Sequence, residues 1–382
     1  MSSTALPSPA IAPPAAPLIL PTGEAMPPLL RPPRGVSDLA QQLDHPSGYL
    51  ALSSGNQHFV LPAVPGFIAY RPQGRHLFLF GGVHGGPATW QPLLDAFLAY
   101  AAGQRRAVVA VQLRAPQLAL FAERGFTVNP LGTSFGLHLP DFRLAGTRRM
   151  KLRNKIVRAR RLGLQVREVG PELPRSPATW AALSAISDSW LRRKGKKELD
   201  FMIGELGRPD EAQRRVFVVQ YADAATGSGY RHSGQNELGD NWVGFITYVP
   251  VYGQYPGYLH DLTRRLPAAP PGAMELCNAE AMTRLQAEGT RYLHFGFTPF
   301  VTGESLGHLG SAIAALPSVN SSRWLDRAIR LLHRYGRAIY PAQSQADYKR
   351  KWGPDLIEPE YVAARPLSLR AIWDLLRLTR SL

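Results

Sequence analysis

The stretch between Asp261 and Glu275 has the residue types and the spacing that binding of a charged substrate requires. Asp261, Arg264 and Arg265 stand at the end of a short run with strand character, and Glu275 opens a segment with helical spacing. Carboxylates and guanidinium groups form strong charge-assisted hydrogen bonds with groups of opposite charge. The order strand, loop, charged strand end and helix therefore predicts a site that grips an anionic or polar substrate.

Two strands and a helix must position these side chains. The β-branched and aromatic run Val243–Val249 is typical of a buried strand, and we expect Pro250 to end it. After a loop rich in Tyr, Gly and Pro, Tyr258–Arg265 is expected as a second strand. Met274–Gly289 has apolar residues at helical spacing and is expected as a helix.

Composition limits the class of protein. A chain of 382 residues is too long for one ordinary domain, and its net charge of +16 favours an anionic partner, either nucleic acid or an anionic lipid surface. A merely solvated basic surface is the alternative. Cys277 is the only cysteine, so we expect no disulfide framework and a small core residue at this position.

The sequence offers no sign of insertion into a membrane or of export. No apolar run approaches the ~20 residues that span a bilayer. The first residues also lack the basic region and the unbroken apolar region of a signal peptide. We expect a cytoplasmic protein, with peripheral contact to the inner face of the plasma membrane as an addition.

The chain divides into four predicted parts. Residues 1–35 are rich in proline and are expected to be a disordered tail. Residues 36–146 and 147–365 both alternate strands and helices, which suggests a duplicated fold of the mixed α/β class. Residues 366–382 form a basic amphipathic helix, which either lies in a membrane interface or docks onto its own domain.

A basic helix is predicted over residues 147–162, at the start of the second part. Residues 148–161 carry eight basic residues and no acid. Such a face suits contact with a phosphate backbone or with anionic lipid, and a solvated linker helix is the alternative. The expected contact residues for tRNA or anionic lipid are Arg148, Arg149, Lys151, Arg153 and Lys155.

Other catalytic motifs are weak or absent. The segment Gly132–Gly136 matches the G-x-S-x-G pattern of serine hydrolases, but strand-like sequence and Pro140 follow Ser134 where a helix is required. No phosphate-binding P-loop occurs, and the histidines show no metal-ligand spacing. We find no good copy of the acetyl-CoA pyrophosphate loop. We therefore expect neither a metal site nor an organic cofactor.

Several motifs together resemble a known family. The central run VGFITYVPVYG, then YLHDLTRRLPAAPPGAMELCNAEAM and EGTRYLHFGFTPF, resembles the catalytic domain of phosphatidylglycerol lysyltransferases, which are related to multiple peptide resistance factor. KLRNKIVRARRLGL, YKRKWGPDLIEPEYVA and, in the first half, GTSFGLHLPDFRLAG extend the likeness over about residues 40–365. The chain resembles the soluble, free-standing members, without the multi-span flippase region.

The resemblance implies a fold and a reaction. The fold would be a tandem of GNAT-like acyltransferase folds joined by the basic helix, with the site in the second. The enzyme would move an aminoacyl group, lysyl first, from a charged tRNA to a lipid hydroxyl such as that of phosphatidylglycerol. Its partners would be aminoacyl-tRNA and anionic phospholipid, and the ester needs no cofactor because it is already activated.

The resemblance also implies roles for individual residues. Asp261 and Glu275 match acidic positions that would hold the donor ammonium, and Arg264 would hold phosphate with Arg265 behind it. An ordinary surface or ion-pair role is the alternative for each. Asp261, Arg264 and Glu275 are the catalytic candidates, and the remaining substrate-binding candidates are Lys194, Lys196, Lys197, Tyr248, Lys349 and Lys351.

Other functions stay open at this point. A GNAT-like transferase could use another activated acyl donor or a soluble acceptor. A non-catalytic protein that binds RNA or membranes and a serine hydrolase are further alternatives. The acidic candidates do not distinguish a lysyl from an alanyl or arginyl donor.

Overall fold

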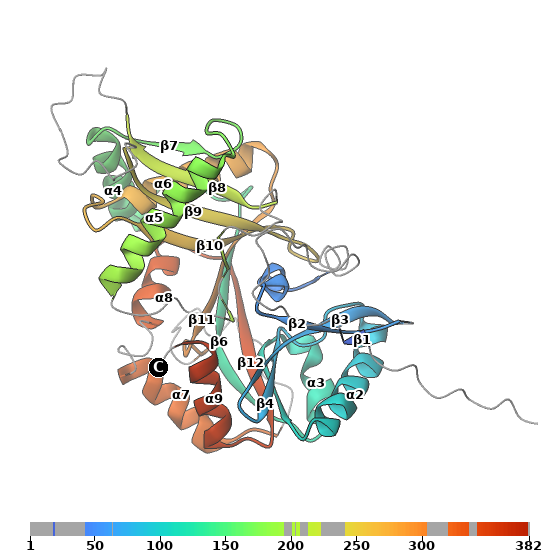
Figure 1. The fold of residues 1–382 in the computed structure, drawn as a ribbon. Coiled ribbons are helices and arrows are strands. Elements are labelled where there is room, and N and C mark those ends of the chain that lie inside the picture. The colour runs from blue at the N-terminus through green and yellow to red at the C-terminus, as the bar shows by residue number, and fades with distance from the viewer. Residues whose placement is uncertain are drawn as a thin grey trace, which may run out of the picture.

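One continuous mixed sheet organises the molecule (Figure 1). The computed structural model describes residues 18–19, 43–62, 64–194, 201–202, 204–206, 213–222, 241–303, 320–335 and 342–380. Within this part of the chain the strand order is β1-β2-β3-β4-β5-β12-β6-β11-β10-β9-β8-β7. The strands are β1 Leu18–Ile19, β2 Gln57–Leu61, β3 Val64–Gln73, β4 His76–Phe80, β5 Ala107–Leu113, β6 Thr127–His138, β7 Leu164–Glu168, β8 Arg215–Tyr221, β9 Trp242–Val251, β10 Gly257–Arg265, β11 Tyr292–Pro299 and β12 Leu356–Arg365.

The two halves of the sheet are built alike. In the first half, β4 and β5 are parallel and α2 (Pro87–Gly103) connects them. In the second half, β10 and β11 are parallel and α6 (Ala273–Ala287) connects them. Parallel neighbours need such a crossover, whereas the flanking antiparallel strands are joined by shorter connections. This correspondence agrees with the predicted duplication.

The two halves exchange a strand at the centre of the sheet. β6 follows β5 in the chain but pairs with β11, while β12 follows the second half and pairs with β5. β6 and β12 also pair with each other, and Figure 1 shows them side by side between the halves. The expected boundary near residue 146 therefore falls between β6 and the next helix, and the sheet continues across it.

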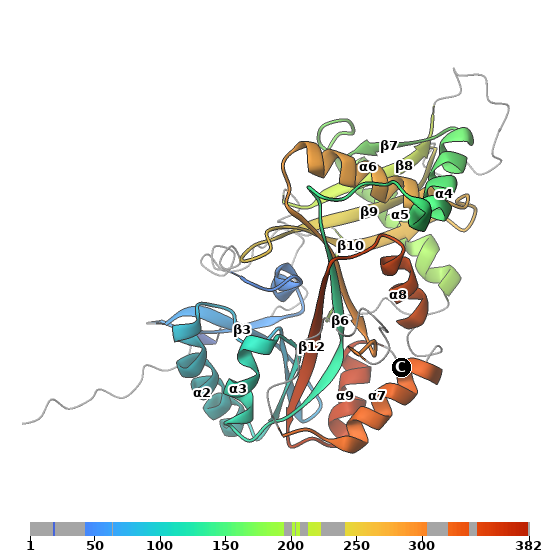
Figure 2. The same ribbon diagram turned by 180° about the vertical axis from the view of Figure 1, so that it is seen from behind.

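Helices cover both faces of the sheet in each half. α2 and α3 (Leu118–Ala122) pack on one face of the first half, and α9 (Leu369–Leu378) packs on the other. In the second half α4 (Met150–Arg161) and α6 cover one face, and α5 (Pro177–Lys194) covers the other. α8 (Ala342–Arg350) lies between the two halves, and α7 (Arg323–Tyr335) lies beside α9 at the lower end, as seen from behind in Figure 2.

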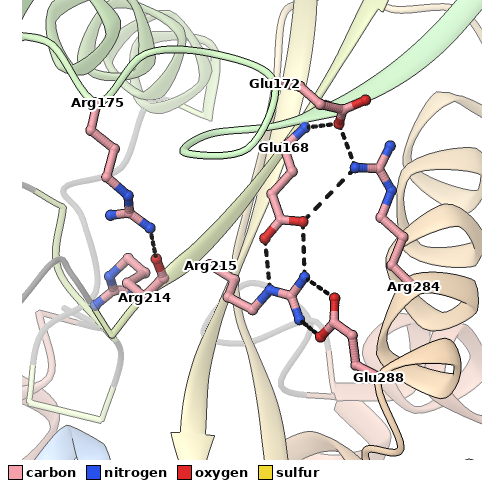
Figure 3. Close-up of polar contacts among 7 residues, drawn as sticks. All are labelled: Glu168, Glu172, Arg175, Arg214, Arg215, Arg284 and Glu288. Atoms are coloured by element: carbon pink, nitrogen blue, oxygen red, sulfur yellow. Dashed lines mark hydrogen bonds and ion pairs between the residues drawn. The ribbon is translucent and has the colours of Figure 1, made fainter.

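A charge network ties α6 to the outer strands of the second half (Figure 3). The guanidinium of Arg215 on β8 forms two bonds to Glu168 of β7, 2.7 and 2.8 Å long, and also pairs with Glu288. Arg284 of α6 pairs with Glu172. Burial opposes the charge of Arg215, but the carboxylates of Glu168 and Glu288 raise its pKa. The network therefore fixes the position of α6 relative to the edge strand β7 and its neighbour β8.

Several expectations are met by the described residues. Cys277 is fully buried, and Gly132–Gly136 lies inside β6 with neighbours on both sides, so no nucleophile elbow exists there. The basic segment forms α4 and the C-terminal segment forms α9. No helix in the described part of the chain is long and apolar enough to cross a membrane.

Other expectations need correction. β9 continues through Pro250 to Val251, because β8 pairs only as far as Tyr248 and the missing N–H of a proline is tolerated where one neighbour is absent. The expected tail includes Leu18–Ile19, which pair with β2, and the rest of residues 1–35 lies outside the described residues. β12 was not expected from the sequence.

Candidate active site

A cavity of about 1080 Å³ is lined by residues from both halves of the molecule. Its wall comes from β10, β11 and β12 and from α6, α7, α8 and α9. This volume is at the upper limit of ordinary small-molecule pockets. Six of the residues singled out in the sequence line it: Lys155, Asp261, Arg264, Arg265, Glu275 and Lys349.

Asp261 takes part in a buried ion pair at the cavity wall. Its Oδ2 lies 2.5 Å from Nη1 of Arg214, and its Oδ1 accepts a 2.9 Å bond from the backbone N–H of Gly204. The side chains of Asp261 and Arg214 are 3% and 1% exposed. Arg175 donates to the carbonyl oxygen of Arg214 at 3.0 Å (Figure 3). Asp261 of β10 thus holds Arg214 and Gly204 in place, and it also lines the cavity.

Glu275 lies in the first turn of α6, between two lysines. Its Oε1 accepts bonds from Nζ of Lys351 at 3.0 Å and from Nζ of Lys155 at 3.2 Å. Burial opposes ionisation, but these two ammonium groups and their hydrogen bonds lower the pKa of Glu275. The carboxylate is therefore charged at neutral pH, and the two lysines give the cluster a net positive charge.

The two arginines at the end of β10 have different environments. Arg264 is buried, its guanidinium lies 4.3 Å from the ring centroid of Trp190, and its Nε donates to the Ser187 hydroxyl at 3.2 Å. Arg265 is exposed at the cavity wall. α5 therefore anchors Arg264, whereas Arg265 is available to a ligand phosphate at the cavity wall.

Lys349 of α8 extends its side chain to β11, one of the central strands of the sheet. Its Nζ donates to the carbonyl oxygens of Gly296 and Phe297 at 2.7 and 3.0 Å and to the Thr298 hydroxyl at 2.7 Å. These three acceptors match the three N–H groups of an ammonium. Burial lowers the pKa of Lys349 to about 7, and the charge of Glu360 acts in the opposite direction. The observed geometry leaves Lys349 no N–H for a phosphate.

Glu360 is an acid that the sequence analysis did not single out. It is completely buried on β12, accepts a bond from the Ser134 hydroxyl, and has no partner for Oε2 among the described residues. Burial raises its pKa to about 8. The serine of the G-x-S-x-G pattern is therefore bonded to a carboxyl group in the sheet interior.

The opposite end of the cavity is apolar. α7 and α9 supply aliphatic side chains there, together with the loop that precedes α9. In Figure 1 these helices lie at the other end of the molecule from α4, whose Lys155 lines the polar end. The apolar lining residues are Leu325, Ala328, Ile329, Leu332, Leu367, Ala371, Ile372, Leu375 and Leu376.

Some predicted substrate residues lie away from the cavity. Tyr248 is fully buried because α6 covers that face of β9, and its hydroxyl donates to Asn278 at 2.6 Å. Its place in the core argues against direct substrate contact. The side chains of Lys194, Lys196 and Lys197 lie outside the described residues.

The basic helix α4 uses part of its charge within the molecule. Arg149, in the turn just before α4, donates to the carbonyl oxygen of Trp352 at 3.2 Å, and Arg153 of α4 donates to that of Gly146 at 2.6 Å. Lys155 is paired with Glu275, as described above. Arg148 and Lys151 are exposed and remain available to an external anion.

The residues missed by sequence reasoning are partners rather than motif members. Arg214 follows a segment without periodicity, and Glu360 stands in an unrecognised strand. A basic residue just before a buried strand and an acid inside an apolar run are weak signals, which could have drawn attention to both.

Comparison with known proteins identifies the family. The chain belongs to the family described as phosphatidylglycerol lysyltransferase, C-terminal, whose model matches residues 37–364. The predicted fold class, a mixed α/β fold with two similar halves, is confirmed by the sheet, and the solved structures below share this fold.

Relatives with curated names point in the same direction. The lysylphosphatidylglycerol biosynthesis bifunctional protein LysX of Mycobacterium sp. (strain JLS) is 25% identical over 321 residues, which cover 84% of this chain and 28% of that protein. LysX of Mycolicibacterium vanbaalenii is 26% identical and covered to 27%. The chain therefore spans about a quarter of the length of these relatives.

Two solved structures share the fold. L-PGS from Bacillus licheniformis superposes with a TM-score of 0.69 at 20% identity, over 92% of this chain and 98% of that one. The C-terminal domain of a putative lysylphosphatidylglycerol synthetase from Agrobacterium fabrum gives a TM-score of 0.68 at 22% identity, over 89% and 93%.

Proposed function

We propose that this protein transfers an aminoacyl group from a charged tRNA to the hydroxyl of an anionic phospholipid, with lysyl and phosphatidylglycerol as the first candidates. The observation that carries the proposal is the polarity of one cavity. Carboxylates and basic groups line one end, and aliphatic side chains line the other. An aminoacyl ester and a lipid need such opposite environments at a single reaction centre.

The polar end would receive the donor. Glu275 is ionised and lines the cavity, and it would bind the α-ammonium group of the aminoacyl residue in exchange for one of its two lysine partners. Asp261 would shape the cavity wall nearby, because its charge is balanced by Arg214. Arg265, and Arg264 behind its contact with Trp190, would attract phosphate. Lys151 of α4 and Arg148 in the turn before it are exposed and would contact the tRNA backbone.

The reaction is a transesterification and needs no external oxidant or energy source. The lipid hydroxyl oxygen attacks the carbonyl carbon of the aminoacyl ester, and the bond from this carbon to the ribose oxygen breaks. The hydroxyl proton ends on the released ribose oxygen. The protein would contribute mainly by holding both substrates in line within one cavity.

The test is a lipid comparison by mass spectrometry. The protein is expressed in a host that lacks aminoacylated lipids, beside its Glu275→Gln variant. We expect a new aminoacyl-lipid mass with the parent protein and at least a tenfold weaker signal with the variant, roughly the loss of one charged contact. Lys155 and Lys351 are partly exposed, at 50% and 32%, so this variant leaves no buried unpaired charge.

A second assay tests the donor. Purified protein is mixed with phosphatidylglycerol vesicles and either lysyl-tRNA or free lysine with ATP. Transfer from lysyl-tRNA alone, abolished by ribonuclease, supports the proposal. Transfer from a CoA thioester in place of tRNA, or no lipid product with any charged tRNA, would contradict it.

A further inference from the structure

The outer surfaces of α7 and α9 carry large apolar side chains in an arginine-rich setting. Trp324, Leu331 and Tyr335 of α7 are 42%, 58% and 67% exposed. Leu369 and Trp373 of α9 are 76% and 54% exposed. Large exposed apolar groups of this kind mark contact with a partner or a membrane when they gather in one place.

The spacing on α7 places its exposed apolar residues in a single line. Trp324, Leu331 and Tyr335 recur after seven and four residues, which is the repeat of one helix face. Leu325, Ile329 and Leu332 occupy the adjacent face and line the cavity. α7 therefore has more apolar surface than it buries against the rest of the protein.

α9 also has a face that lines the cavity and, next to it around the helix axis, an exposed apolar face. Ala371, Asp374 and Leu378 are buried against the sheet, and Ile372 and Leu376 line the cavity. Leu369 and Trp373 come next around the helix and are exposed. Both helices thus present a cavity face, then an exposed apolar face.

The charges beside these apolar faces are almost all positive. Two acids occur on the two helices, and both are used inside the molecule: Asp326 accepts a 2.7 Å bond from Asn129, and Asp374 lies 2.7 Å from Nδ1 of His76. The arginines of the two helices and their ends are all exposed: Arg323, Arg327, Arg330, Arg334, Arg370, Arg377 and Arg380.

We propose that α7 and α9 together form the surface that docks this protein on an anionic lipid bilayer. Trp324, Leu331, Tyr335, Leu369 and Trp373 would enter the headgroup region, and the arginines would meet lipid phosphates. Because both helices also wall the apolar end of the cavity, docking would place this end against the source of a lipid substrate. In this respect the inference deepens the proposed function.

The alternative face for a bilayer is α4, at the other end of the molecule in Figures 1 and 2. This helix is also basic and exposes Met150 and Val157, at 49% and 41%. It adjoins the polar end of the cavity, through Lys155, and not the apolar end. Its two exposed apolar residues therefore provide a matched control.

The first experiment measures binding of the purified full chain to vesicles without tRNA. Vesicles of phosphatidylglycerol mixed with phosphatidylcholine are compared with phosphatidylcholine alone. We expect binding to the anionic vesicles, with about tenfold weaker binding for the double variant Leu331→Gln and Trp373→Gln. The double variant Met150→Gln and Val157→Gln should bind like the parent. The substituted side chains are exposed, and matching thermal unfolding would show that each variant is folded.

A second experiment reports the docking face directly. Cys277 is fully buried, so an environment-sensitive dye attached through Leu331→Cys reads only that site. Anionic vesicles should shift its emission to the blue, whereas dye attached through Val157→Cys should not respond. A response at residue 157 alone, equal binding of both double variants, or self-association through the α7 and α9 face without vesicle binding would overturn the proposal.

These outcomes are independent of catalysis. Vesicle binding at α7 and α9 without formation of an aminoacyl lipid would contradict the proposed reaction and keep the docking surface. If the α7 and α9 variant keeps both lipid aminoacylation and vesicle binding unchanged, the docking surface is contradicted and the proposed reaction is kept.

Discussion

At the scale of single residues, Asp261 combines a position at the cavity with a structural role. Its carboxylate neutralises Arg214 in a pair that is almost inaccessible to water. A buried charge left without its partner destabilises a protein strongly, whereas replacing both partners costs far less. Loss of activity in an Asp261 variant therefore has two possible causes, which must be separated.

We expect Asp261→Asn to lower the free energy of unfolding by about 3 kcal/mol or more, because Arg214 keeps its charge. Denaturant unfolding of Asp261→Asn, Arg214→Met and the double variant measures the coupling. A double variant no less stable than either single variant supports the ion pair, whereas additive losses would rule it out.

Glu360 and Lys349 form a second buried site whose protonation differs between the folded and unfolded states. The folded pKa of Glu360 is about 8, above its ordinary value of 4.5, so the folded chain binds more protons between these values and stability falls as pH rises. Lys349 has a folded pKa of about 7, below its ordinary 10.5, so its contribution to stability rises with pH over that range.

We therefore expect Glu360→Gln to become progressively more stable relative to the parent as pH rises from about 4.5 to 8. Below this window the protonated acid and the amide behave alike. Thermal unfolding over the pH range measures the difference between the two proteins. A difference independent of pH would show that Glu360 is ionised in the folded protein throughout.

At the scale of elements, α9 depends on a few contacts with the sheet. Asp374 pairs with His76 of β4, and the Ser368 hydroxyl caps the helix by accepting a 3.1 Å bond from the N–H of Ala371. The remaining faces of this short helix line the cavity or are exposed. Its stability is therefore lower than that of a helix buried in the core.

We expect Asp374→Ala to open α9 locally while the sheet remains protected. Hydrogen exchange should accelerate by about tenfold or more in residues 369–378, since a buried hydrogen-bonded partner is lost. Asp347→Ala on α8 is the matched control, because its pair with Arg350 is exposed and worth little. Equal effects of the two substitutions would argue against the role of the His76 pair.

At the scale of the whole molecule, the excess positive charge is divided between two ends. α4 lies at one end with Arg148 and Lys151 exposed, and α7 and α9 lie at the other. Lys155 of α4 and side chains of α7 and α9 line the same cavity. This arrangement would allow a polyanion and an anionic bilayer to be bound at the same time without competing for one surface.

We expect the double variant Arg148→Gln and Lys151→Gln to weaken tRNA binding. The slope of log affinity against log salt concentration should become shallower by about one for each charge removed. Titration of tRNA at several salt concentrations measures the slope. The double variant Arg327→Gln and Arg334→Gln on α7 should leave the slope unchanged. If the α7 variant alone flattens it, the assignment of the two ends is reversed.

The sequence by itself determined the local structure and the residues most prominent at the site. Its periodicity predicted β9, β10, α6 and the basic helix, and the charges between Asp261 and Glu275 do line a cavity. Local patterns allowed this because strand and helix repeats follow from which side chains face the core. The resemblance to the lysyltransferase family supplied the fold class and the expected reaction.

Only the tertiary structure decided how distant parts of the chain meet. The placement of β12 beside β5, the pairing of Arg214 with Asp261 and the burial of Tyr248 join residues far apart in sequence. The joint role of α7 and α9 as walls of one cavity has the same origin. No local pattern encodes such contacts, because they depend on how the two halves exchange strands across a shared sheet and on which surfaces this exchange leaves open.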